Sequence, residues 1–164
     1  MKKIKLVSLL LLSFSGSLLA TNFNLVEPMN FSVFMSTNGE CSLDSATGNV
    51  TELSGNGFCA YAEGASPATF KFTGIPNEDY EFKVNLLAAS NSNGYMFTPE
   101  GSITSDLESK VALVGSFVRV NAGTTGIINI RVGGRLRVDS STNLQAGTKY
   151  RVREVFSISW QEAP

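Results

Sequence analysis

Apolar and polar residues alternate along this chain with a period of two. In residues 80–86, YEFKVNL, the apolar side chains occupy one parity, and Glu81, Lys83 and Asn85 occupy the other. A period of two places the two sets on opposite faces of a β-strand. No stretch after residue 20 shows a sustained apolar period of 3.6 residues. The pattern therefore predicts an all-β protein.

The longest alternating stretch is IINIRVGGRLRV at residues 127–138. Its apolar face consists of Ile128, Ile130, Val132, Leu136 and Val138. Its other face carries Arg131, Arg135 and Arg137. Gly133 and Gly134 interrupt the alternation, where we expect a bulge or a close approach of two backbones.

Further short strands are expected, each bounded by Gly, Asn, Ser, Pro or Asp. One is the terminal stretch, where Tyr150, Val152, Phe156, Ile158 and Trp160 share a parity and complete a hydrophobic core. Residues 70–72 and 80–86 flank the turn-forming TGIPNED and are expected to form a β-hairpin. The other expected strands are 22–34, 40–44, 48–53, 57–62, 94–98 and 111–120. About eight or nine short strands, each buried on one face, predict an antiparallel β-sandwich or a small barrel.

Residues 1–20 have the pattern of a secretory signal peptide. Lys2, Lys3 and Lys5 precede an apolar run that ends near Leu19, and the small residue Ala20 follows. The run is shorter than the ~20 apolar residues of a membrane span, so no transmembrane anchor is expected. We expect export, followed by a single domain over residues 21–164.

The charge of the expected mature chain is mildly acidic and unevenly distributed. Beyond residue 20 there are ten basic and fourteen acidic residues, which argues against a nucleic-acid partner. Residues 21–118 carry three lysines against eleven carboxylates, whereas residues 119–164 carry seven basic residues against three acidic ones. The chain is charge-segregated along its sequence.

The two cysteines, Cys41 and Cys59, are expected to form a disulfide. They are 18 positions apart in a chain predicted to reach an oxidising compartment. With no histidine and no third cysteine, a metal site lacks its usual ligands, so no metal is expected. In the chain-entropy model, closing a loop of this size stabilises the fold by ~3 kcal/mol.

The absence of histidine also removes the common catalytic triads, so we expect no enzyme activity and no cofactor. Glu78, Asp79 and Glu81 form the densest carboxylate group, but a turn and an outward strand face favour solvated side chains. The DSATGN stretch at residues 44–49 reads better as a turn with Gly48 at positive φ than as a calcium loop.

The arginines are the best candidate for a binding surface. Five of them share outward parities on two expected strands: Arg131, Arg135, Arg137, Arg151 and Arg153. If those strands are neighbours, the patch could hold a sulfated glycan, a phosphate group or an acidic protein surface. It could also dock head to tail on the acidic segment of another copy, an association that weakens as salt rises. The alternative is that the arginines only maintain solubility and protect sheet edges.

Several motifs together resemble the bacterial domain-of-unknown-function family 4402. They are the Asn30–Phe31 pair, the turn with Asp44, Ala46, Thr47 and Gly48, the segment with Pro67, Ala68, Phe70, Gly74 and Pro76, and the positions Val132, Gly133, Gly134, Leu136, Val138, Gln145, Gly147 and Tyr150. The similarity extends over nearly all of residues 21–164. It implies an extracytoplasmic, Ig-like or pilin-like β-sandwich in Gram-negative bacteria, and it implies no catalytic residues.

These observations predict a structural or adhesive protein of the periplasm or cell surface, with a fimbrial subunit as one form of it. In that form, the first strand either completes its own domain or is donated to another subunit; its apolar parity is Phe23, Leu25, Met29, Phe31 and Val33. The alternative function is a carbohydrate-binding module or lectin that stacks sugars on Tyr61, Tyr95 and Phe97.

Overall fold

The computed structural model describes residues 21–35, 39–55, 59–61, 64–87, 95–138, 148–152 and 156–164. The predicted signal peptide, residues 1–20, lies outside this part. The described residues form strands, turns and bends without a helix. Thirteen strands follow in order: β1 (Asn22–Glu27), β2 (Phe31–Met35), β3 (Gly39–Leu43), β4 (Val50–Gly55), β5 (Ala60–Tyr61), β6 (Ala68–Thr73), β7 (Asp79–Leu86), β8 (Tyr95–Thr104), β9 (Ser109–Leu113), β10 (Val118–Asn121), β11 (Ile127–Val138), β12 (Thr148–Val152) and β13 (Phe156–Glu162).

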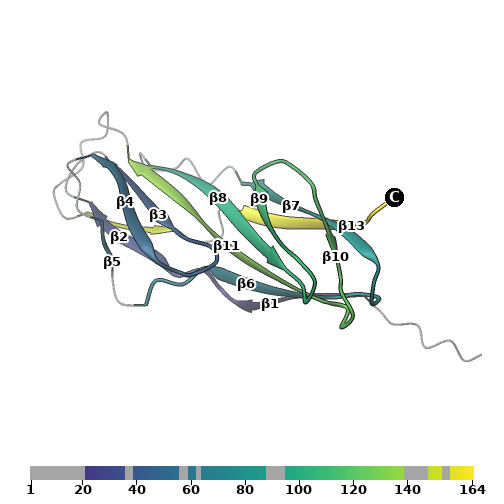
Figure 1. Ribbon diagram of the computed structural model, residues 1–164. Helices are drawn as coiled ribbons and strands as arrows, with labels where there is room; N and C mark the ends of the chain where they lie inside the picture. The colour runs from purple at the N-terminus through teal and green to yellow at the C-terminus, as the bar shows by residue number, and fades with distance from the viewer. Residues whose placement is uncertain are drawn as a thin grey trace, which may run out of the picture.

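One layer is a seven-stranded antiparallel sheet organised around β11 (Figure 1). Along one edge β11 pairs first with β6 and then with β3, and along the other it pairs with β8 over residues 129–138. β1 extends the sheet beyond β6, β4 extends it beyond β3, and β9 extends it beyond β8. β11 is therefore the central strand that connects all parts of this sheet.

The second layer consists of two three-stranded sheets, in the orders β10-β7-β13 and β12-β2-β5. Figure 1 shows the first of them toward one end of β11 and the second toward the other. The expected antiparallel β-sandwich is thereby confirmed. The number of strands exceeds the expected eight or nine mainly because three expected strands each divide in two.

Two of the divisions occur where the backbone cannot continue a regular ladder. The stretch 22–34 splits into β1 and β2 around Pro28, which has no N–H to donate. The stretch 111–120 splits into β9 and β10 at Gly115, which has φ 81°. The terminal stretch splits into β12, which pairs with β2, and β13, which pairs with β7. Each split moves the chain from one sheet to another.

The predicted hairpin of residues 70–72 and 80–86 is wrong. β6 pairs with β1 and β11, whereas β7 pairs with β10 and β13, so the turn between them crosses from one layer to the other. Phe72 and Tyr80 meet across the layers with ring centroids 4.6 Å apart. The Tyr80 hydroxyl accepts a hydrogen bond from the Ile75 N–H at 2.8 Å, which anchors the crossing.

The core forms where the alternation predicted it. The apolar face of β11 is buried, with exposures of 0–2% for Ile128, Ile130, Val132, Leu136 and Val138. From β7, Tyr80, Phe82 and Val84 are buried at 0–1%, while Leu86 at the strand end is 41% exposed. The aromatic centre is Phe72, whose ring contacts those of Tyr80, Phe82 and Trp160.

The glycine pair of β11 marks a close approach of backbones, as expected. A Cβ on Gly133 would lie 2.2 Å from the Leu43 carbonyl oxygen, and one on Gly134 would lie 2.4 Å from that of Thr98. The register with β8 continues through both residues, so there is no bulge between these two strands. Glycine is required here because β3 and β8 press on β11 from its two edges.

Cys41 and Cys59 form the predicted disulfide, with Cα atoms 5.9 Å apart. Cys41 is fully buried in β3, and Cys59 directly precedes β5. The bridge therefore joins the main sheet to the β12-β2-β5 sheet.

Candidate functional site

The structure places three of the five candidate arginines on one face of one strand. Arg131, Arg135 and Arg137 lie on the outward face of β11. Arg151 lies on β12, which pairs with β2 rather than with a strand of the main sheet, and its side chain is outside the description. Arg153 also lies outside the described residues. Among the described side chains, the predicted patch is represented by Arg131, Arg135 and Arg137.

The arginines of the main sheet contact acidic or polar groups of their own chain. Arg135 forms an ion pair with Glu40 at 3.6 Å, and the guanidinium of Arg131 donates to the Ala46 carbonyl oxygen. Arg137 is exposed. At Arg135 and Glu40, the basic and acidic segments of the sequence therefore meet in space.

The turn beside Arg131 forms as predicted. Asp44 accepts hydrogen bonds from the Ala46 and Thr47 N–H groups at 3.0 and 2.6 Å, and from the Thr47 hydroxyl at 2.7 Å. These bonds, led by that of the Thr47 hydroxyl, lower the pKa of Asp44. Gly48 has φ 80°. The Asp44 carboxylate is thus used within the turn.

The first segment is used within its own chain. β1 pairs antiparallel with β6, and Phe23 stacks on Phe70 with centroids 5.4 Å apart. Met29 and Phe31 are buried at 9% and 0% exposure, as their parity predicts. Leu25 is 56% exposed beside a register shift of β1, so its expected inward placement is wrong. Val33 lies in β2, and its side chain is outside the description.

The aromatic residues of the lectin alternative do not form an observed platform. Phe97 has 0% exposure and packs edge-on to Phe31 with centroids 6.2 Å apart, so it is not available to stack on a sugar. Tyr61 and Tyr95 lie in β5 and β8, and their side chains are outside the description. The assignment of Phe97 as a sugar-binding residue is therefore wrong, because its ring belongs to the core.

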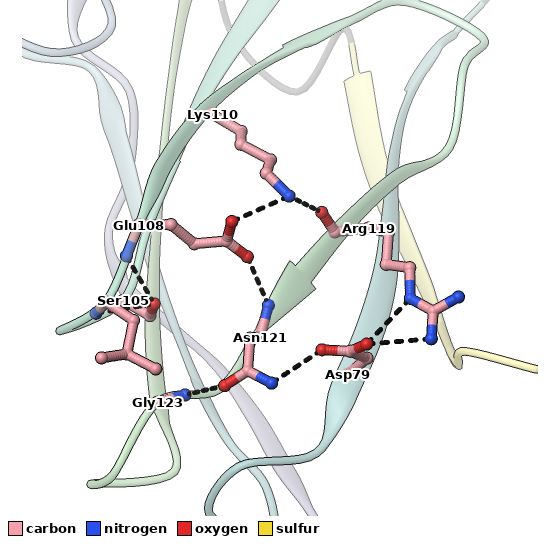
Figure 2. A network of polar contacts seen from close by, with 8 residues as sticks. Asp79, Ser105, Glu108, Lys110, Arg119, Asn121 and Gly123 are labelled. Atoms are coloured by element: carbon pink, nitrogen blue, oxygen red, sulfur yellow. Dashed lines mark hydrogen bonds and ion pairs between the residues drawn. The ribbon is translucent and has the colours of Figure 1, made fainter.

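The carboxylate group at the start of β7 is only partly solvated. Glu78 is exposed, as expected. Asp79, in contrast, accepts from the Arg119 Nε at 2.9 Å and from the Asn121 amide nitrogen at 2.7 Å (Figure 2). The Asn121 bond, followed by the Arg119 bond, lowers the pKa of Asp79. Glu81 accepts from the Gln161 amide at 2.7 Å on the outer face.

A second pair of charges completes this network and covers the edge of β10. The Glu108 carboxylate accepts from the Asn121 backbone N–H at 2.6 Å, and the Lys110 ammonium donates to the Arg119 carbonyl oxygen at 2.6 Å (Figure 2). Glu108 and Lys110 also pair with each other at 2.9 Å. The Asn121 bond and the lysine lower the pKa of Glu108. Two main-chain groups that an edge strand leaves free are thereby occupied by side chains.

We call this flank of the sandwich, formed by β9 and β10 with Asp79, the closed side. The turn between β10 and β11 is held by Asp106, whose carboxylate accepts hydrogen bonds from the N–H and hydroxyl of Thr124. Gly123 has φ 66°, and a Cβ there would lie 1.4 Å from a carboxylate oxygen of Asp106, so glycine is favoured at this position. Among the residues that the structure describes, no group of three or more His, Cys, Asp or Glu side chains could hold a metal ion.

The opposite flank is formed by β1 and β13, and we call it the open side. Phe70 of β6 joins its two strands, because the ring stacks on Phe23 of β1 and meets Phe156 of β13 with centroids 6.3 Å apart. All three rings are only half-buried. Ile158 and Trp160 of β13 are also half-buried at this flank. No other described strand pairs with the outer edge of β13. Partly exposed aromatic and aliphatic side chains next to an unpaired strand edge are a surface on which another protein can dock.

No family model, no curated protein and no solved structure matches this chain. The resemblance to family 4402 therefore stays a prediction. Within the described part of the chain, no helix has the length and apolar character needed to cross a membrane.

Proposed function

We propose that the protein is an exported, non-catalytic structural or adhesive component of the bacterial cell surface, and that a fimbrial-type subunit is its specific form. One observation carries the proposal: the sandwich covers the edge of β10 with Glu108 and Lys110, whereas no strand of the described residues pairs with the outer edge of β13 beside its half-buried aromatic residues. A domain built in this way acts through contact with another protein.

The non-catalytic part of the proposal is supported by the state of the carboxylates. A general acid or base needs a carboxyl group that can reach a substrate. Asp79 and Glu108 are instead tied to main-chain and side-chain partners on the closed side, and their pKa values are lowered rather than raised. The chain contains no histidine that could serve in their place.

The location on the cell tests this proposal. Intact cells of the source bacterium can be treated with a protease and labelled with an antibody against the folded domain, while a periplasmic enzyme serves as the internal control. We expect labelling of intact cells and loss of the protein upon proteolysis, with the periplasmic control preserved. Recovery of all the protein as a free periplasmic species, protected from protease, contradicts the proposal.

A further inference from the structure

The edge strands of this sandwich differ in how they are protected against pairing with another chain. Edge strands are commonly blunted by charge, proline, bulges or shortness. β1 has a register shift between Leu25 and Glu27 and is followed by Pro28. β4 also has a register shift and carries Glu52. β9, the third terminal strand of the main sheet, carries Lys110, whose ammonium bonds to the Arg119 carbonyl oxygen of β10. The three terminal strands of the main sheet thus each carry a protective feature.

The edges of the second layer show the same features, with one exception. β5 has only two residues, and β12 carries a lysine and an arginine. β10 is covered by Glu108 and Lys110. β13, in contrast, runs for seven residues, FSISWQE, in continuous register with β7, and its one charged residue is Glu162 at the end. It contains neither proline nor glycine.

The hydrogen bonds around β7 show which groups of β13 are free. The Val84 carbonyl accepts from the Gly115 N–H on the β10 side, whereas the Asp79 carbonyl accepts from the Ala163 N–H on the β13 side. Main-chain groups alternate between the two edges of a strand. The odd-numbered residues of β7 therefore bond to β13, where their partners are Ser157, Ser159 and Gln161.

The remaining residues of β13 direct their N–H and C=O groups to the other edge. These residues are Phe156, Ile158, Trp160 and Glu162. Among the described residues, no strand pairs with this edge. The same residues include the half-buried side chains of the open side, so a strand added here would satisfy their backbone groups and cover their side chains together.

We propose that this edge binds the β13 strand of a second copy of the chain, antiparallel and about a two-fold axis through Ser159. In this register all seven residues of β13 overlap with their symmetry mates, and no two like charges stand opposite each other. Ile158 faces Trp160 of the second copy, and Ser157 faces Gln161. The two small sheets then join into one six-stranded sheet with a closed symmetry.

The choice of a second copy follows from this self-complementarity. Aromatic and β-branched side chains are favourable cross-strand neighbours. The pairing places Ile158 and Trp160 side by side on the core face of both copies, and it leaves only serine and glutamine at the junction on the outer face. The inference deepens the proposed function, because it names the first partner of the subunit, and it rests on that function only for its biological setting.

A disulfide trap tests the register. Ser159 uses its main-chain groups toward β7, so across the axis it forms a non-hydrogen-bonded pair with a Cα separation of about 4.5 Å. That spacing suits a disulfide. In the exported full-length protein carrying Ser159→Cys, we expect mild oxidation to yield a dimer on a non-reducing gel.

Ser157→Cys is the matched control, since it is the same substitution on the same outer face. The two copies of residue 157 lie about 14 Å apart in the proposed register, too far for a disulfide. We therefore expect at least tenfold less cross-linked product from this variant. Equal cross-linking of both variants overturns the register, and the absence of cross-linking in both overturns the pairing.

Sedimentation equilibrium of the exported protein tests the association itself. We expect a reversible monomer–dimer equilibrium, and we expect Ser157→Lys to raise the dimer dissociation constant about tenfold or more because a lysine at the edge opposes strand pairing. Asn24→Lys on β1, also exposed, is the control and should leave the constant unchanged. A protein that stays monomeric at every concentration, or equal effects of the two lysines, overturns the inference.

The two proposals fail separately. A dimer with the expected cross-link in a protein that never reaches the cell surface supports the β13 pairing and contradicts the proposed function. A surface protein that is monomeric supports the function and contradicts the pairing.

Discussion

The two flanks of the sandwich differ in what bonds to the main-chain groups of their edge strands. On the closed side, the edge of β10 would leave the Asn121 N–H and the Arg119 carbonyl without partners, and the Glu108 and Lys110 side chains occupy them. On the open side, β13 has comparable main-chain groups and no such cover within the described residues. This fold can therefore cover a strand edge with side chains. The lack of such a cover on β13 among the described residues is the difference that supports the proposed pairing of this edge.

The two flanks also differ in the kind of side chain that holds them together. The closed side is held by charge-assisted hydrogen bonds that run from Asp79 through Asn121 to Glu108. The open side is held by rings, with Phe70 between Phe23 and Phe156. Charged groups are stabilised by hydration, whereas burying the exposed part of a half-buried ring against a partner lowers the free energy further. The comparison predicts separate responses to mutation, acid and concentration.

The largest expected effect is the loss of the ring that joins the open side. Phe70→Ala removes contacts with both Phe23 and Phe156, and we expect it to lower the unfolding free energy by about 2 kcal/mol, less than for a fully buried Phe. Urea denaturation measures the loss. Phe117→Ala near the closed side is the control: its ring is 43% exposed beneath the Lys83 ammonium, so we expect a change below about 1 kcal/mol. Equal losses would contradict the distinction between the flanks.

Uncovering β10 should make the closed side behave like the open side. The double variant Glu108→Ala and Lys110→Ala leaves the Asn121 N–H and the Arg119 carbonyl exposed, and we expect about 1 kcal/mol of lost stability. We also expect species larger than a dimer in light scattering, because each copy then has a second free edge. A variant that is destabilised without larger species would show that Glu108 and Lys110 have no role in protecting the edge.

The faces of the strands could be predicted from sequence, but their neighbours could not. The period of two assigned the buried set of β11, and the cysteine pair and the Gly48 turn were also correctly predicted. The predicted β-hairpin is wrong because the turn-forming residues TGIPNED can connect two strands of one sheet or two strands in different layers equally well. Which layer receives β7 is decided by Phe72 and Tyr80 meeting in the core, a contact with no local signal.

The candidate site was harder to predict for the same reason. Glu108 directly precedes β9 and Lys110 lies within it, a spacing that indicates a charged edge, but their role as a cover depends on where β10 lies. The aromatic parity of β13 was apparent, whereas its freedom on one edge depends on the sheet order. Phe97 looked like an exposed aromatic residue because a five-residue window around it cannot reveal that β8 is central in the main sheet.

Acid should weaken the closed side, which holds two of the three described carboxylates with a lowered pKa; the third is Asp44. Hydrogen bonds from Asn121 and its neighbours lower the pKa values of Asp79 and Glu108 below 3.8 and 4.5, the values that apply when the chain is unfolded. A lowered pKa contributes stability that is complete above the unfolded value and is lost as pH falls through the folded one. We expect urea midpoints to be level above pH 5 and to fall toward pH 3, with a smaller fall for Glu108→Gln. An unchanged fall in that variant would place the acid sensitivity elsewhere.

The smallest expected effects concern the arginines of the outer face. Arg135 is 53% exposed and pairs with Glu40 at 3.6 Å, so Arg135→Gln should change the unfolding free energy by less than about 0.5 kcal/mol. If association proceeds through the main chain of β13, Arg135→Gln should also leave the dimer dissociation constant and its salt dependence unchanged. Association that weakens steeply with salt and is lost in this variant would restore the arginine surface as the site of contact.

Amide hydrogen exchange, followed by NMR at increasing protein concentration, tests the central claim most directly. The backbone amide of Asn121, which donates to the Glu108 carboxylate, should be protected from exchange at every concentration. The amides of Ile158 and Trp160, which face the free edge of β13, should exchange rapidly in dilute protein and become protected as the dimer forms. Protection of Ile158 and Trp160 that does not depend on concentration, or rapid exchange of Asn121 at all concentrations, would contradict the account.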